Sequence, residues 1–180
     1  TDPVMVEDVV AFSPNTDIYS TVPGVPPSIP PVAGKDNPGS GEYKLALAYQ
    51  NYEEPSFIST PTPGANVSFF RDCLGSQPST VIIQSQFVLN NNELTCAGSD
   101  NAPQSIIRNV ADFQVRYLFQ DRAAAITGLP TIQYMNAAAV GANWMSVFGV
   151  EVCLVLYGDE RIDLPAGSTY TGCDGVAVNM

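Results

Sequence analysis

The sequence predicts an α+β protein that is mostly antiparallel β. Within residues 106–119, large apolar side chains recur at every second position from Phe113 onward, with Gln114, Arg116 and Leu118 on the other face, which is the period of a half-buried strand. Residues 147–157 form a second apolar strand of comparable length, and three consecutive asparagines predict a turn between two further strands. We expect these pieces to share one antiparallel sheet. The apolar face of its central strand consists of Phe113, Val115, Tyr117 and Phe119.

The first 42 residues predict an irregular arm. After a short apolar start, residues 21–42 contain so many prolines and glycines that neither a helix nor a central strand fits them. Because no apolar core precedes this run, we interpret it as an arm on one domain that comprises residues 43–180. A chain of 180 residues has a usual length for a single domain.

The remaining elements follow from local patterns. Residues 121–143 are rich in alanine but have a weak period, so we expect a loop with short helical turns. Trp144 is expected to be a packing anchor at the start of the strand 147–157. The many apolar residues of this strand predict a central position in the sheet. Further strands are predicted over residues 43–50, 67–71, 80–89 and 93–97, with the turn at Asn90, Asn91 and Asn92.

The four cysteines predict two disulfides. They form no CxxC pair, and an even number of cysteines in a chain rich in turn residues indicates an exported protein from an oxidising compartment. Cys73 and Cys96 flank the predicted hairpin, whereas Cys153 and Cys173 span the exit of the last long strand. We therefore predict the bonds Cys73–Cys96 and Cys153–Cys173.

The charge and the composition argue against several classes of function. The chain has 7 Lys and Arg against 18 Asp and Glu, a net charge of −11, so it lacks the basic cluster that nucleic acid or an anionic membrane requires. It contains no histidine, which removes the commonest general base and the commonest transition-metal ligand.

Acidic side chains are the abundant candidates for catalysis. A glycosidase needs two carboxylates that face each other across a cleft, and the spacing in this sequence selects no such pair. We therefore predict that the protein is not an enzyme. The candidate catalytic carboxylates are those of Glu53, Glu54, Asp72, Asp112, Asp121, Asp159, Glu160 and Asp163.

Two groups of acids have the oxygen ligands that calcium prefers, but neither has the alternation and the glycine of an EF-hand loop. They are Asp159, Glu160 and Asp163, and Asp36 with Glu42. No metal or other cofactor is therefore predicted. Residues 66–68 form an N-x-S sequon, which only a suitable secretory host would glycosylate.

Five segments carry a family resemblance when they are taken in order. They are DCLG (residues 72–75), LTCAG (94–98), VADFQVRY (110–117), QYMNAA (133–138), and Trp144 with the strand that follows it. In this order they resemble the central block of the PilW family of type IV pilus minor pilins, over residues 72–157. The chain departs from the family where Leu118 and Phe119 follow Tyr117, since Gly-Val-Asp is often found there.

The resemblance implies a pilin-like globular head and a role in priming pilus assembly at the tip. Its partners would be other minor pilins, the major pilin and a tip adhesin. In the full-length protein, an apolar helix N-terminal to Thr1 would anchor the head in the inner membrane and pack on the sheet, so an apolar face should lie partly bare here. The protein would lie on the periplasmic face of that membrane before assembly and in the extracellular pilus afterwards.

Two other functions remain open from the sequence. A J-type pseudopilin of type II secretion occupies a similar tip position, and the genomic neighbourhood would separate it from a pilin. An exported carbohydrate-binding or surface-binding adhesin module would use Trp144 and the tyrosines as stacking platforms.

Overall fold

The computed structural model describes residues 30–51, 53–55, 66–68, 70–77, 82–99, 102–120, 131–160 and 162–179, and these are mostly antiparallel strands with very little helix. The strands are β1 (Val32–Ala33), β2 (Leu45–Gln50), β3 (Glu53–Pro55), β4 (Asn66–Ser68), β5 (Ile82–Asn90), β6 (Glu93–Gly98), β7 (Gln104–Ile107), β8 (Val110–Gln120), β9 (Ile132–Met135), β10 (Val147–Leu156), β11 (Thr169–Thr171) and β12 (Ala177–Asn179). The helical elements within these described residues are α1 (Ala137–Val140) and the 3₁₀ helix η3 (Trp144–Ser146).

The chain divides into two compact units. The first comprises residues 1–33, 46–86 and 96–104, and the second comprises residues 34–45, 87–95 and 105–180. Residues 1–29 of the expected arm lie outside the described residues. Within the rest of the arm, Val32 and Ala33 form β1, which pairs antiparallel with Leu47 and Ala46 of β2. The expected boundary at residues 42 and 43 stays a prediction.

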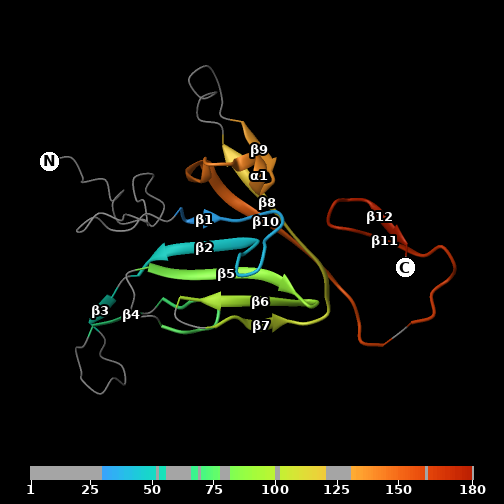
Figure 1. The fold of residues 1–180 in the computed structure, drawn as a ribbon, viewed down its shortest axis with the longest axis horizontal. Coiled ribbons are helices and arrows are strands. Elements are labelled where there is room, and N and C mark those ends of the chain that lie inside the picture. The colour runs from blue at the N-terminus through green and yellow to red at the C-terminus, as the bar shows by residue number, and fades with distance from the viewer. Residues whose placement is uncertain are drawn as a thin grey trace. The chain divides into compact units, whose positions relative to one another are not determined.

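A five-stranded sheet has the order β1-β2-β5-β6-β7 (Figure 1). The predicted asparagine turn joins β5 to β6 through a two-residue loop. Asn91 and Asn92 have φ values of 49° and 61°, and a type I′ turn requires positive φ at both positions. Asparagine tolerates this left-handed conformation better than most residues, so the local sequence explains this hairpin.

A separate three-stranded sheet has the order β10-β8-β9, with β8 in the centre (Figure 1). The alternation predicted for β8 is confirmed, because Phe113, Val115 and Tyr117 are buried while Gln114 and Arg116 are exposed. Strand β10 pairs antiparallel with β8 from Val147 to Leu156, and β9 pairs antiparallel with the end of β8.

Two predictions about these sheets are wrong. The hairpin β5–β6 belongs to the five-stranded sheet, whereas the strands β8 and β10 belong to the separate three-stranded sheet. Strand β10 lies at one end of the three-stranded order and is not central. Its many apolar residues led to the wrong prediction, because Phe148, Val152 and Leu156 are each exposed by about half or more.

The segment predicted as a loop with helical turns also contains a strand, which its sequence pattern did not predict. Residues 121–130 lie outside the described part, but Ile132–Met135 form β9 and Ala137–Val140 form the short helix α1. Strand β9 alternates with apolar Ile132 and Tyr134 on one side. This pattern was too short to outweigh the neighbouring alanines.

Candidate interaction surfaces

Tyr117 is the centre of the packing in the second unit. It is 1% exposed, its hydroxyl donates a hydrogen bond of 2.9 Å to the carbonyl oxygen of Lys44, and its ring meets Trp144 edge-on with centroids 4.9 Å apart. Burial, followed by the charge of Asp36, raises the pKa of Tyr117 above its usual value, so the phenol stays a neutral donor. Trp144 is therefore engaged in packing, as its position before the strand predicted.

Gly34 is required where the loop 34–44 passes over this tyrosine. A Cβ at position 34 would collide with the hydroxyl oxygen of Tyr117 and with the carbonyl oxygen of Lys44. One of these neighbours is backbone and cannot move aside cheaply. The absence of a side chain at this position is what allows the loop and β8 to approach each other.

The carboxylate of Asp36 accepts hydrogen bonds from backbone N–H groups in the first turn of α1, although Asp36 is distant in sequence. Its Oδ1 accepts a hydrogen bond of 2.9 Å from the backbone N–H of Ala137, and its Oδ2 accepts one of 2.9 Å from Ala138. The side chain of Asn136 caps the same helix by accepting from the N–H of Ala139 at 2.8 Å. Three otherwise unpaired donors of a four-residue helix are thus satisfied.

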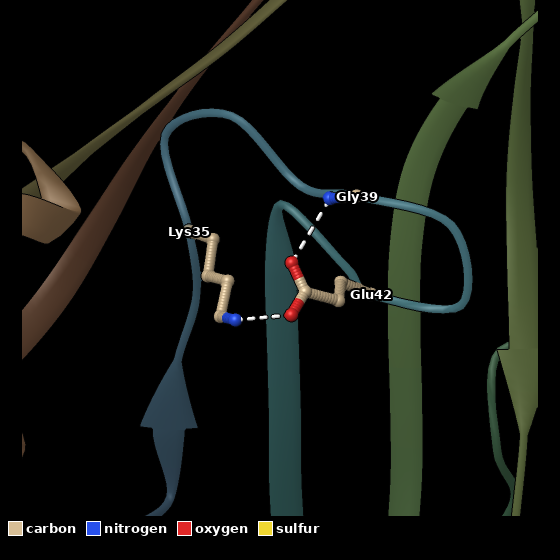
Figure 2. Close-up of polar contacts among 3 residues, drawn as sticks. All are labelled: Lys35, Gly39 and Glu42. Atoms are coloured by element: carbon tan, nitrogen blue, oxygen red, sulfur yellow. Dashed lines mark hydrogen bonds and ion pairs between the residues drawn. The ribbon is translucent and has the colours of Figure 1, made fainter.

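Glu42 makes two contacts within the same loop (Figure 2). One carboxylate oxygen accepts a hydrogen bond of 2.9 Å from the N–H of Gly39, and the other forms an ion pair with the ammonium group of Lys35. The hydrogen bond from Lys35, followed by that from Gly39, lowers the pKa of Glu42. Asp36 and Glu42 form one of the candidate groups of calcium ligands. In the structure they therefore have separate partners.

The structure places the remaining acidic candidates apart, each with its own local environment. Asp72 is buried, and its Oδ1 accepts hydrogen bonds from the N–H groups of Leu74 and Ser76 in a tight turn. Asp112 accepts from Gln114, and Asp159 accepts from Asn109. Glu160 and Asp163 are exposed. Over the described ranges, no group of three or more acidic or cysteine side chains is arranged to hold a metal ion.

Some candidates lie partly or wholly outside the described residues. Glu53 and Glu54 belong to β3 and Asn66 belongs to β4, which pair with each other, but their side chains lie outside the description. Asp121 falls outside the described residues altogether.

Each unit contains one disulfide, and the pairs are those that the cysteine positions predict. In the first unit Cys73 is bonded to Cys96, with the Cα atoms 6.4 Å apart, and Cys96 is fully buried. In the second unit Cys153 of β10 is bonded to Cys173, with the Cα atoms 5.6 Å apart. The guanidinium of Arg116 also donates to the carbonyl oxygen of Cys173 at 3.3 Å. The segment after β10 is thereby tied back to the sheet.

The three-stranded sheet has an exposed apolar face. Leu118 points away from the buried face of β8 and lies opposite Tyr134 of β9 and Gly149 of β10. The register of β10 shifts between Val147 and Gly149, and Phe148, which lies between them, is exposed. Ile132 lies two residues before Tyr134 on the same face. Tyr134, Ile132 and Phe148 are 60%, 61% and 58% exposed. We call Leu118, Ile132, Tyr134 and Phe148 the outer patch.

A second apolar surface is a hollow of about 690 Å³ beside the end of β10. One side is formed by Val155, Leu156 and Tyr157, and the other by residues of the segment 162–170, which include Ile162 and Leu164. We call this feature the C-terminal hollow.

The comparison with known families decides the affiliation of the chain. A family model described as PilW, type IV pilus-assembly protein W, matches residues 78–179, which is more than half of the sequence. The chain belongs to the PilW family. Neither a curated protein nor a solved structure matches it significantly.

The PilW match extends from just before β5 to the end of β12 and so contains both apolar surfaces of the second unit. Membership of PilW assigns the chain to type IV pilus assembly, which implies contact with other pilus components and a periplasmic or pilus location. Among the described residues, no helix has the length and apolar character needed to cross a bilayer.

Proposed function

We propose that this PilW-family chain is a minor pilin, a structural subunit that helps to initiate type IV pilus assembly and belongs to the tip complex. The family match carries the proposal. The outer patch supports it, because an apolar surface of several large side chains on a sheet usually marks a site where another protein segment packs. Its partners would be other minor pilins, the major pilin and a tip adhesin.

We further propose that the head is pilin-like and works without catalysis. In the full-length protein, an N-terminal apolar helix would anchor it in the inner membrane and pack on the sheet, and the outer patch supplies apolar side chains of the kind that such packing needs. The two disulfides suit an exported subunit, since they persist in the oxidising periplasm and outside the cell.

The test is complementation of a strain that lacks the gene. Wild-type protein should restore surface pili and twitching motility, whereas Phe148→Asp in the outer patch should restore neither, although the purified head still folds. Val176→Asp is the matched control, because Val176 is also 58% exposed but lies outside the outer patch. Normal piliation in the deletion strain would overturn the proposal.

The same strains separate the alternative functions. A J-type pseudopilin would cost the deletion strain its type II secretion and leave its pili intact. An adhesin module would bind a glycan array on its own. Trp144, which an adhesin module would use together with the tyrosines, is packed against Tyr117.

A further inference from the structure

The C-terminal hollow is lined by several exposed apolar side chains. Ile162, Leu156 and Leu164 are exposed by 76%, 58% and 50%, and Tyr157 by 44%, and all four line the hollow. Single exposed apolar side chains are normal, but a contiguous group around a concavity indicates a surface that another molecule covers. The volume of about 690 Å³ lies within the roughly 300–1,000 Å³ that is typical of binding pockets.

Hydrogen bonds to two neighbouring turns, and a disulfide to β10, lie beside the two sides of the hollow. On the side of β10, the N–H of Tyr157 donates to the carbonyl oxygen of Asn109 at 3.0 Å, and the hydroxyl of Tyr157 accepts from Asn92 at 3.0 Å. On the other side, the Cys153–Cys173 disulfide ties the segment after β10 back to the strand. The hollow is therefore a built feature of the second unit.

The charge around the hollow selects between possible occupants. Glu160 lines it, and residues 158–164 contain three acids and one basic residue. A second copy of this chain, with its own net charge of −11, would set acidic residues against acidic residues, and an anionic lipid surface would be repelled in the same way. A positively charged apolar segment meets both requirements, because its side chains fill the hollow and its charge complements the rim.

We propose that the C-terminal hollow binds an amphipathic, basic segment of another pilus protein. This inference rests on the proposed function, since it names the chemistry of a partner for the same assembly role. Apolar contact with Ile162 and Leu164 supplies the affinity, while Glu160 selects against acidic segments. The hollow is distinct from the outer patch, whose residues it does not share.

A pair of synthetic peptides tests the proposal directly. An 18-residue amphipathic helix of leucine and lysine, labelled for fluorescence anisotropy, should bind the purified protein, and its leucine–glutamate counterpart should not. Ile162→Asp and Leu164→Asp should each weaken binding at least tenfold. Val176→Asp should bind as the wild type does, because Val176 has an exposure of 58% but belongs neither to the C-terminal hollow nor to the outer patch. Unchanged circular dichroism would show that each variant folds.

Electrostatic selection has its own measurements. Glu160→Lys should weaken binding of the leucine–lysine peptide, and raising the salt concentration should weaken the wild-type complex. Equal binding of both peptides, or wild-type affinity in Ile162→Asp, would overturn the proposal. So would self-association or binding to anionic vesicles that Ile162→Asp abolishes, because these results would assign the hollow to a second copy or to a lipid surface.

Complementation distinguishes failure of this inference from failure of the proposed function. If Ile162→Asp restores pili fully while Phe148→Asp does not, the hollow has no role in assembly but the minor-pilin function stands. If the deletion strain is fully piliated, the proposed function itself fails. Loss of pili in Ile162→Asp together with loss of peptide binding supports both.

Discussion

The carboxylate of Asp36 binds the backbone of Ala137, 101 residues further along the chain, and holds the adjacent N–H of Ala138 as well. A four-residue helix is far too short to be stable alone, so this contact is part of the reason that α1 exists.

Replacement of Asp36 should therefore destabilise the second unit. We expect Asp36→Ala to lower the free energy of unfolding by about 1–2 kcal/mol, the range of a lost helix cap with its donors left unpaired. Asp36→Asn, which keeps one acceptor oxygen, should cost less. Urea unfolding followed by circular dichroism measures both, with Asp163→Ala as an exposed acidic control; equal stability of Asp36→Ala and Asp163→Ala would contradict the capping role.

The Tyr117 hydroxyl makes a second separable contribution. Tyr117→Phe leaves the ring against Trp144 but removes the donor to the carbonyl oxygen of Lys44, so we expect a loss of roughly 1–3 kcal/mol. Tyr117→Ala also creates a cavity and should cost roughly 3–5 kcal/mol or prevent folding. Tyr134→Phe, at an exposed tyrosine, is the control. Thermal unfolding that ranks Tyr117→Phe with Tyr134→Phe would show that the hydrogen bond contributes nothing.

The two disulfides should link the same cysteines in solution as in the structure. Non-reducing peptide mapping should recover Cys73 with Cys96 and Cys153 with Cys173, and crossed pairs would refute the arrangement. The double replacement of Cys153 and Cys173 by serine opens a link across 20 residues, which removes about 3 kcal/mol of stabilisation in the chain-entropy view. It should also abolish peptide binding at the C-terminal hollow, while the outer patch continues to function.

Glu42 should make a small, pH-dependent contribution to stability. Its pKa is lowered in the folded protein, chiefly by the hydrogen bond from Lys35, so the carboxylate form is favoured on folding. The contribution is fully present above the unfolded pKa of Glu42 and disappears as the pH falls through the folded value. An NMR titration of Glu42 should give a pKa below that of a free glutamate, and Lys35→Met should move it back up. A normal pKa for Glu42 in the wild type would be inconsistent with the contact in Figure 2.

The parts of the fold that local chemistry controls were predictable. Asn91 and Asn92 specify a turn by their tolerance of positive φ, and the alternation around Tyr117 specifies the buried face of β8. The cysteine positions predicted pairs that are bonded in the structure because a hairpin brings its flanks together. The family resemblance on residues 72–157 led to the family that the model match shows.

The position of β10 was not predictable in the same way. An apolar strand with Phe148, Val152 and Leu156 has the composition of a central strand, but pairing partners, not composition, decide which strand lies at the edge. Strand β9 was missed because four alternating residues before an alanine run give too little periodic signal. Asp36 gave no local sign of its role, since its partners lie 101 and 102 residues away.

The sequence alone thus determined the strands with a clear period, the asparagine hairpin, the cysteine pairs and the family. Each of these depends on neighbouring residues or on a preserved order of motifs. Only the tertiary structure decided how the strands divide into sheets and where apolar side chains remain exposed. Whether a side chain is exposed depends on the groups that cover it, and those groups come from distant parts of the chain.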